Sequence, residues 1–322
     1  MRLTGLVVGA ALSMLAWSVP THAQTLSTAP LKIIVPAAPG SPPDLVPRIL
    51  QEGLAGRLGV PVIVENRPGA FGSIGLTQLA RSNADGQTIA VMSATFLAAP
   101  GLVPGLPLDI GRDLAAVAML VATPSLLFVP ASSPDRSVAE LIGRAKQNPG
   151  LVRFASGGIG SPPHWRAVAF ARDAGIQLAH IAYRGGASTL PALLASEVDM
   201  LIGGPSVFSG ALSAGKVRAL ATTNAVRLAA FPDTPTLSEL GFPSAEGTDW
   251  YGVVVRSGTP DALIQRLHAA LARTLEEPAI RQKLASASFD ITLLGSAEFA
   301  ARLQSESTRM LRLIRETGMR SE

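Results

Sequence analysis

Short apolar runs alternate along the chain with longer stretches in which apolar residues recur every three or four positions. The first pattern is typical of buried strands and the second of amphipathic helices. Their alternation predicts an α/β protein with mostly parallel sheets and flanking helices. We predict strands at 32–35, 62–64, 89–92, 125–129, 152–155, 179–182, 200–202, 217–222 and 250–255. We predict helices at about 44–58, 72–81, 138–147, 165–174, 189–194, 260–275 and 297–317.

Three helix starts carry residues that stabilise a helix N-terminus. Ser137 and Glu140 form a capping box, with Ser137 at the N-cap and Glu140 reaching back. Pro260 is expected at the first position of the next-to-last predicted helix. Pro47 is best tolerated in the first turn of its helix, which predicts that this helix begins near Asp44 and that Asp44 is the N-cap.

The first 23 residues have the layout of a secretory signal peptide. Arg2 precedes an apolar run that ends near Val19, and Thr21-His22-Ala23 provides a cleavage site of small residues. The apolar run is shorter than the roughly 18–20 residues of a membrane-spanning helix. Pro, Gly or charged residues interrupt every later run. We therefore expect a soluble, exported protein with residues 1–23 removed.

Composition excludes several classes of function. Hydrophobic residues make up 48% of the chain, which favours a folded protein of about two domains. The chain has no Cys, so neither disulfides nor thiolate chemistry can contribute. With a formal charge of +4, scattered arginines, 2 Tyr and 3 Trp, it lacks the basic tract and stacking platforms of a nucleic-acid-binding protein. Mild positive charge instead favours small anions.

Catalytic and cofactor motifs are weak. Ser161 and His164 stand three residues apart, and Asp44 or Asp199 could complete a hydrolase triad. The chain lacks a G-x-S-x-G elbow, however, and two prolines stiffen the segment between Ser161 and His164. The histidines are scattered, and the glycine turn at 158–160 lacks the third glycine of a dinucleotide loop. We expect no metal and no cofactor, and a secreted serine hydrolase stays an alternative.

Polar, glycine-rich loops follow several of the predicted strands. The clearest are residues 35–44, 66–75 and 155–161, each followed by a predicted helix. This order of strand, loop and helix aims backbone N–H groups and a helix N-terminus at one point, where a small anion binds. The first and third loops are built alike, which predicts two similar lobes that face each other. The loops therefore predict a binding cleft.

The chain resembles the periplasmic solute-binding proteins of tripartite tricarboxylate transporters, known as the Bug or TctC family. The resemblance covers essentially the whole chain after residue 23. The residues that carry it are Val35-Pro36 through Asp44, Glu65–Ala70, Gly72, Ile74-Gly75, Asp85-Gly86, Ser137–Leu141, Ala155-Ser156-Gly157, Tyr183 with Gly185, Val198-Asp199, Ala214–Ala221 and Phe231–Thr236.

The resemblance implies a two-lobed type II periplasmic-binding-protein fold, the Venus flytrap. Lobe one is expected to comprise 28–129 and 255–322, and lobe two 130–254. A small organic acid bound between the lobes would be delivered to integral-membrane transporter subunits, by a periplasmic, non-enzymatic protein that we expect to be a monomer. A ligand sensor for a regulatory membrane partner is the other alternative.

The resemblance and the loops together predict a set of ligand-binding residues. Backbone N–H groups, hydroxyls, a carboxylate and one side-chain donor from a His or a Tyr would surround the ligand. These residues are Gly40, Ser41, Asp44, Ser93, Thr95, Ser156, Gly157, Ser161, His164 and Tyr183.

The chain departs from the family pattern in its first loop. Ala37 stands where an aromatic residue is common, residues 41–43 replace Gly or Thr, and Gly204 replaces an Asn. The two prolines at 42 and 43 have no N–H to donate to a ligand. We therefore expect the segment 156–164 to contribute more of the recognition, and Ala37 to leave a roomier mouth for a bulkier ligand.

Overall fold

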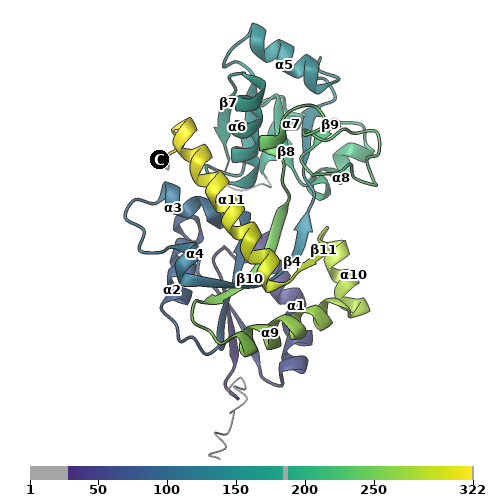
Figure 1. Cartoon of the computed structure of the whole chain (residues 1–322). Coiled ribbons are helices and arrows are strands. Elements are labelled where there is room, and N and C mark those ends of the chain that lie inside the picture. The colour runs from purple at the N-terminus through teal and green to yellow at the C-terminus, as the bar shows by residue number, and fades with distance from the viewer. Residues whose placement is uncertain (1–27, 184–187, 321–322) are drawn as a thin grey trace, which may run out of the picture.

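Two β-sheets with flanking helices, one sheet in each half of an elongated molecule, organise the structure (Figure 1). The computed structural model describes residues 28–183 and 188–320. The predicted signal peptide lies outside this part of the chain. Within it, no helix combines the length and the apolar character needed to cross a membrane. The prediction of a two-lobed α/β protein is confirmed.

The first sheet has six strands in the order β11-β4-β10-β3-β1-β2. β1 pairs in parallel with β2 and β3, whereas β10 runs antiparallel to β3 and β4, and β11 antiparallel to β4. The strands are β1 Leu31–Val35, β2 Val62–Asn66, β3 Thr88–Ser93, β4 Leu114–Thr123, β10 Asp249–Arg256 and β11 Asp290–Leu294. The sequence pattern had predicted neither β4 nor β11.

The second sheet has five strands in the order β7-β6-β8-β5-β9. β6 pairs in parallel with β7 and β8, and β5 runs antiparallel to both of its neighbours, β8 and β9. The strands are β5 Leu126–Pro130, β6 Arg153–Ser156, β7 Ala179–Ala182, β8 Met200–Gly203 and β9 Val217–Thr222.

The expectation of mostly parallel sheets is wrong in detail, because four of the described strand pairings are parallel and five are antiparallel. The reason lies in the path of the chain between the sheets. β5 enters the second sheet, and β10 re-enters the first, from the side where the parallel strands end. Each must therefore run against those strands, and the carboxyl ends of the parallel strands in both sheets face the opposite lobe.

The chain changes sheet twice, earlier than the lobe limits expected from the sequence. It leaves the first sheet after Thr123 and returns to it at Asp249. β5 therefore pairs in the second sheet although residues up to 129 were expected in lobe one, and β10 pairs in the first sheet although residues up to 254 were expected in lobe two. We propose lobe limits near residues 124 and 248.

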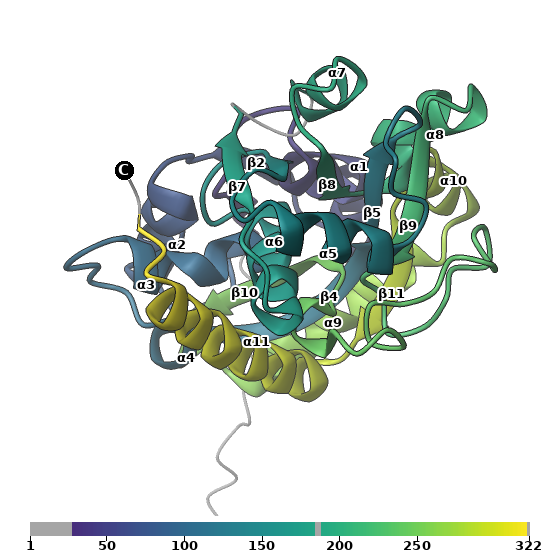
Figure 2. The same cartoon turned by 90° about the horizontal axis from the view of Figure 1, so that it is seen from above.

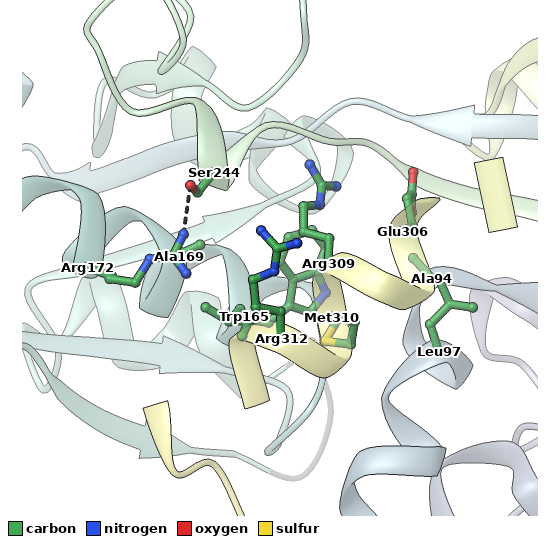
Figure 3. A pocket seen from close by; sticks show the side chains of 11 residues that line it. Ala94, Leu97, Trp165, Ala169, Arg172, Ser244, Glu306, Arg309, Met310 and Arg312 are labelled. Carbon is green, nitrogen blue, oxygen red and sulfur yellow. Dashed lines mark hydrogen bonds between the residues drawn. The ribbon is translucent and has the colours of Figure 1, made fainter. Parts of the chain in front are cut away.

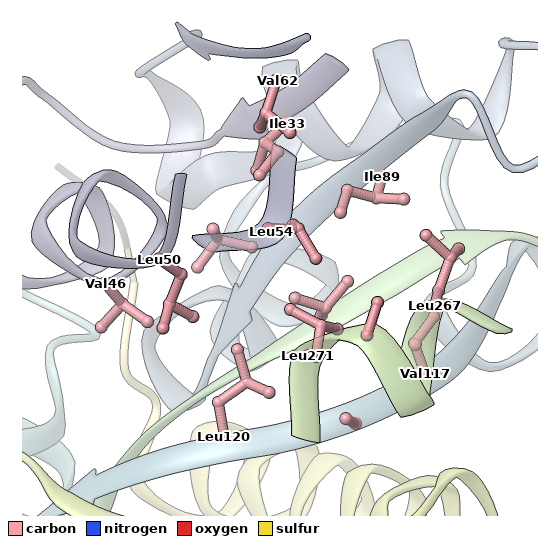
Figure 4. Packing of buried hydrophobic residues seen from close by; sticks show 14 of the residues in the cluster. Ile33, Val46, Leu50, Leu54, Val62, Ile89, Val117, Leu120, Leu267 and Leu271 are labelled. Atoms are coloured by element: carbon pink, nitrogen blue, oxygen red, sulfur yellow. The ribbon is translucent and has the colours of Figure 1, made fainter. Parts of the chain in front are cut away.

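Helices cover both faces of the first sheet (Figures 1 and 2). α1 and α9 pack their leucines on one face, where Leu50, Leu54, Leu267 and Leu271 meet Ile33 and other strand residues in the largest buried cluster (Figure 4). The helices of this lobe are α1 Pro42–Leu58, α2 Ser73–Ala80, α3 Ala99–Leu102, α4 Ile110–Asp113, α9 Asp261–Leu275, α10 Pro278–Ser286 and α11 Ser296–Thr317, with a 3₁₀ turn at Ala94–Ala98.

The last helix, α11, contacts both lobes. Phe299 and Leu303 near its start belong to a cluster of the first lobe, whereas Met310, Leu313 and Ile314 pack in the core of the second. Figure 1 shows α11 running diagonally from the first sheet towards α6. The helices of the second lobe are α5 Val138–Gln147, α6 Pro162–Ala174, α7 Thr189–Leu194 and α8 Pro205–Ser213.

Two of the predicted helix starts differ locally. Ser137 caps α5 as expected, since its hydroxyl accepts from the Glu140 N–H at 3.2 Å, but the Glu140 carboxylate accepts from the N–H of Arg136 rather than from that of Ser137. Pro260 is the N-cap of α9 and not its first residue. α5 therefore begins where predicted, with the Glu140 bond shifted to the residue before the N-cap, whereas α9 begins one residue later than predicted.

Gly252 offers a direct test of how tightly β10 is enclosed. A Cβ atom at this position would lie 2.5 Å from Phe299 Cζ of α11 and 2.7 Å from the carbonyl oxygen of Ala118 in β4. Gly252→Ala should therefore lower the free energy of unfolding by about 1–3 kcal/mol, measured by urea denaturation. Gly56→Ala in α1, where a Cβ meets nothing within 4 Å, is the control and should raise it by about 0.5–1 kcal/mol. Equal effects of the two substitutions would contradict this close packing around β10.

Candidate functional site

A cavity of about 220 Å³ lies between the two sheets and is lined from both lobes. Most of the lining atoms are carbon. The polar groups among them are hydroxyls, the Asp249 carboxylate and the backbone of three glycines. The first lobe contributes Pro42, Leu45, Thr123, Asp249, Tyr251, Ala287 and Phe289, and the second contributes Ala155, Ser156, Gly157, Pro163, Thr189, Ile202, Gly203, Gly204, Val207 and Phe208. The cavity thus lies where the carboxyl ends of the parallel strands face each other.

A buried arginine fixes the floor of this cleft. Arg166 of α6 is fully buried, and its Nη1 donates to Ser125 Oγ at 3.2 Å and to Asp249 Oδ1 at 2.6 Å. Ser125 and Asp249 belong to the two segments in which the chain changes sheet. Thr123 Oγ1 donates to the Asp249 carbonyl at 3.3 Å and joins the same two segments. The hydrogen bonds among these four residues thereby hold the crossing segments side by side.

Asp44 organises the loop that follows β1. Its side chain is 1% exposed and accepts from the Gly40 N–H, from Arg48 Nε and from Asn66 Nδ2, each at 2.8 Å. Burial by itself raises the pKa of the Asp44 carboxyl, but the hydrogen bonds from Arg48, Gly40 and Asn66 outweigh it, so the pKa is lowered. Asp44 thus ties together the first loop, α1 and the end of β2.

The expectation that Asp44 is the N-cap of α1 is wrong. α1 begins at Pro42 with Ser41 as its N-cap, which places Asp44 at the third helical position and Pro47 in the second turn rather than the first. The pair Pro42-Pro43 explains the earlier start, because proline's fixed φ angle and missing N–H are tolerated at the first helical positions. The Asp44 side chain therefore stabilises the loop before α1 and does not cap the N-terminus of the helix.

The two lobes carry the same tetrapeptide at the start of a helix facing the cleft. Gly-Ser-Pro-Pro occupies 40–43 before α1 and 160–163 before α6. Gly40 and Gly160 have φ angles of 76° and 73°, a left-handed conformation that favours glycine. The hydroxyls of Ser41 and Ser161 each donate, at 2.6 Å, to the carbonyl three residues earlier.

The likeness extends to the residue after the prolines. The N–H of Gly40 donates to Asp44 Oδ2, and the N–H of Gly160 donates to His164 Nδ1 at 3.1 Å. A carboxylate and a neutral imidazole therefore play the same part in the two lobes. The glycine N–H groups, including the one predicted to bind ligand at Gly40, are used inside their own loops.

His164 is a buried, neutral histidine. It is 6% exposed, and its ring stacks on that of His180 with 4.0 Å between ring centres. Burial, reinforced by the charge of His180, lowers the pKa of His164 to about 3. Because Nδ1 accepts the Gly160 N–H, the proton of the neutral ring is on Nε2.

Ser156 connects this histidine pair to the cleft. Its hydroxyl accepts the Gly158 N–H at 3.1 Å and lies 2.7 Å from His180 Nε2. The solvent-exposed fraction of Ser156 is 0%, yet the residue lines the cavity beside Gly157. Of the ten predicted ligand-binding residues, Ser156 and Gly157 are the two that line the cleft.

The Ser161 and His164 pair does not have the geometry of a nucleophile and its base. The Ser161 hydroxyl donates its proton to the Gly158 carbonyl, and His164 Nδ1 is occupied by the Gly160 N–H. A serine nucleophile must instead donate its proton to the imidazole that activates it. Among the described residues there is also no group of three or more His, Cys, Asp or Glu side chains placed to hold a metal ion.

The remaining predicted residues lie around the cleft or away from it. Gly40, Ser41 and Asp44 precede or follow the lining residue Pro42, and Ser161 and His164 flank the lining residue Pro163. Ser93 is buried opposite Tyr251 in the first sheet, and Thr95 lies in the 3₁₀ turn after β3. The Tyr183 hydroxyl donates to Glu197 at 3.1 Å on an exposed part of the second lobe.

Residues missing from the sequence-based set come from strands and turns that meet only in the fold. Tyr251 and Asp249 line the cavity from β10, and Phe289 lines it from the turn before β11. The signal that could have found Asp249 and Tyr251 is their place at the start of a strand directly after the second crossing. Ala37, expected at a roomier mouth, packs instead against the hydrophobic core of the first lobe.

Comparisons with known proteins cover most of the chain and agree with one another. Residues 46–319 match the TctC family model, described as "Tripartite tricarboxylate transporter family receptor". The protein BugT of Bordetella pertussis is 30% identical over 314 residues, which are 97% of this chain and 96% of BugT.

Solved structures agree. Rpa4515 of R. palustris, solved with adipate, is 26% identical with a TM-score of 0.76, covering 91% of this chain and 99% of its own. MatC of Rhodopseudomonas palustris, solved with bound malate, is 27% identical with a TM-score of 0.74, covering 89% of this chain and 99% of its own.

Asp44→Asn tests the role of Asp44 as the hub of the first loop. The amide keeps one acceptor oxygen but cannot serve three donors and loses the charge opposite Arg48, so the free energy of unfolding should fall by about 2–4 kcal/mol in denaturant titrations. The control is Asp233→Asn at an exposed position, where the change should stay within about 0.5 kcal/mol. Similar small losses in both variants would show that Asp44 does not hold the loop.

The burial of His164 should make the stability of the protein depend on pH. Its pKa in the folded protein, about 3, lies below the ordinary value of 6.5, so between these pH values the unfolded chain binds more protons. Stability should therefore fall by a few kcal/mol as pH drops from about 6.5 towards 3. His164→Gln should remove that part of the slope in urea titrations at several pH values. An unchanged slope in His164→Gln, or an NMR pKa near 6.5 for His164, would contradict the burial of this ring.

Proposed function

Because the chain belongs to the TctC family, the receptors of tripartite tricarboxylate transporters, we propose that it binds a small organic carboxylate between its two lobes. It then delivers this ligand to the membrane subunits of such a transporter. The observation that carries the proposal is the cavity lined from both sheets, at the carboxyl ends of their parallel strands.

The chemistry of the cavity supports a short organic acid. Leu45, Val207 and Phe289 offer carbon surface to a ligand's chain, and a volume of about 220 Å³ suits a molecule of few heavy atoms. The Tyr251 hydroxyl stays protonated and available as a donor, because burial raises its pKa well above the usual value. Two structural relatives of this chain were solved with malate and with adipate, which are acids of this size.

The positive ends of helices supply the complementary charge. α1, α6 and α8 all begin at the cleft, where Pro42, Pro163 and Gly204 line it. Prolines occupy the first positions of these helices and remove N–H donors there. We propose that a carboxylate is held by the backbone of Gly157 and Gly204 and by the hydroxyl of Tyr251.

Location and partners follow from the same proposal. The segment 1–23 would direct export, and the mature protein would act in the periplasm as a monomer that carries ligand to integral-membrane subunits. Closure of one lobe on the other would then bury the ligand. We propose no catalytic step and no cofactor, because Ser161 and His164, which resemble a hydrolase pair, are engaged within their own loop beside the cleft.

A thermal-shift screen of mono-, di- and tricarboxylates and aromatic acids tests the proposal. A true ligand at about 100 times its Kd should add about 2.7 kcal/mol of stability, and the matching diamide should add little. Val207→Trp should abolish this gain without lowering the melting temperature of the free protein, since Val207 borders the cleft and is 50% exposed.

The matched control is Val226→Trp, at a position that is 71% exposed and does not line the cleft. It should keep the full gain. Stabilisation by an uncharged solute but by no organic acid would overturn the carboxylate assignment, and a ligand gain that survives Val207→Trp would place the site elsewhere.

A further inference from the structure

A second cavity, of about 150 Å³, lies between α6 of the second lobe and α11. Trp165 and Arg172 line it from α6, and Arg309 and Arg312 line it from α11. Figure 3 shows the Arg309 and Arg312 side chains together beside Trp165, with Glu306 farther along the same helix. This cavity shares no lining residue with the interlobe cleft.

Two guanidinium groups lie against the ring of Trp165. The Arg166 Cζ atom is 4.9 Å and the Arg309 Cζ atom 5.6 Å from the centre of that ring. The Nη2 atoms of both arginines lie 3.6 Å from the position that a Cβ atom on Gly247 would take, so they converge on one spot. Bringing two like charges together in a partly buried region is unfavourable unless an anion accompanies them. Asp249 accompanies Arg166, with 2.6 Å between Oδ1 and Nη1, so the charge that lacks an anion is that of Arg309.

Several buried donors of Trp165 and Arg166 have no partner among the described residues. Arg166 is fully buried, and among the described residues neither its Nε nor its Nη2 has an acceptor. The same holds for Nε1 of Trp165, a residue that is 4% exposed and lines the cavity. Leaving buried donors without acceptors costs free energy at each atom. An acceptor with several oxygens in the cavity could satisfy the Trp165 N–H and the Arg309 guanidinium together.

The acidic side chains nearest to Arg309 are occupied elsewhere. Glu306 accepts from Trp250 Nε1 and from Arg302 Nε, both at 2.8 Å, and Glu246 accepts from the Ser238 hydroxyl at 2.7 Å. No carboxylate of the described residues is within ion-pair distance of Arg309. Burial lowers the pKa of Arg309, and the positive charges of Arg166 and Arg302 act in the same direction, against Glu306 and Glu246.

We propose that this cavity is a binding site for a small tetrahedral oxyanion, phosphate or sulfate. Arg309 and the Trp165 indole N–H donate to it, Arg312 stands at its edge, and Arg166 adds positive charge from the buried side. Guanidinium groups match oxyanions through paired N–H donors, which a monatomic chloride cannot use in the same way. The anion would bridge α6 and α11, and so join the second lobe to the helix that spans both lobes.

Thermal shift and calorimetry with inorganic phosphate, sulfate and chloride at constant ionic strength test this site. Phosphate and sulfate should raise the melting temperature of the purified protein, and chloride should not. Arg309→Gln should weaken phosphate binding about tenfold or more, the loss expected for one charge-assisted hydrogen bond. In buffer without oxyanions the same variant should be at least as stable as the parent, because a repulsion has been removed.

Two control variants distinguish this site from diffuse surface charge and from the interlobe cleft. Arg315→Gln, at an exposed position on the same helix, should leave phosphate binding unchanged. Val207→Trp blocks the interlobe cleft and should also leave it unchanged, so this inference can fail or stand independently of the proposed function. Crystals grown with selenate should show its anomalous scattering between Trp165 and Arg309, whether or not Arg309→Gln folds.

Three results would overturn the proposal. One is stabilisation by chloride equal to that by phosphate, which indicates general screening of charge. Another is an equal loss of binding in Arg315→Gln and Arg309→Gln. The third is selenate found in the interlobe cleft, or nowhere on the protein, instead of beside Trp165.

Discussion

The buried guanidinium of Arg166 is the constraint on which the arrangement of the two lobes depends. A fully buried charge must be paired, and its partners here, Asp249 and Ser125, lie in the two segments that carry the chain between the sheets. One side chain therefore holds both crossing segments, and with them the floor of the cleft. The same guanidinium lies 4.9 Å from the centre of the Trp165 ring, so the interlobe connection and the proposed anion site share one charged group.

Above this floor, each lobe presents a helix start built in the same way. The hydrogen bonds from Gly40 to Asp44 and from Gly160 to His164 close equivalent loops with chemically different acceptors. The difference matters for charge. Asp44 keeps its negative charge beside Arg48, whereas His164 is held neutral by burial, so the two loops face the ligand with similar backbone shapes and unlike surroundings.

The amino-acid pattern predicted the elements well where helix and strand signals differ clearly. The strands at 179–182 and 217–222 and the helix at 189–194 agree with the structure residue for residue. β4 was missed because its run from Leu114 to Thr123 is rich in alanine and lacks the alternation of a half-buried strand. The relative direction of neighbouring strands could not be predicted, because a hydrophobic pattern shows which residues are buried but not whether two strands run parallel or antiparallel. For the same reason Tyr251 and Phe289 escaped notice as cleft residues, since only the pairing of distant strands brings them there.

The paired prolines at 42–43 and 162–163 also determine how the cleft meets its ligand. Proline has one φ angle available, so the first turns of α1 and α6 sample few conformations before a ligand arrives. Little conformational entropy of these turns would then be lost when a ligand binds. The surfaces on either side of the cleft also cannot change conformation to accommodate a ligand of the wrong shape. If the cleft binds an organic acid as proposed, the fixed distance between the two helix starts would select among acids by their length.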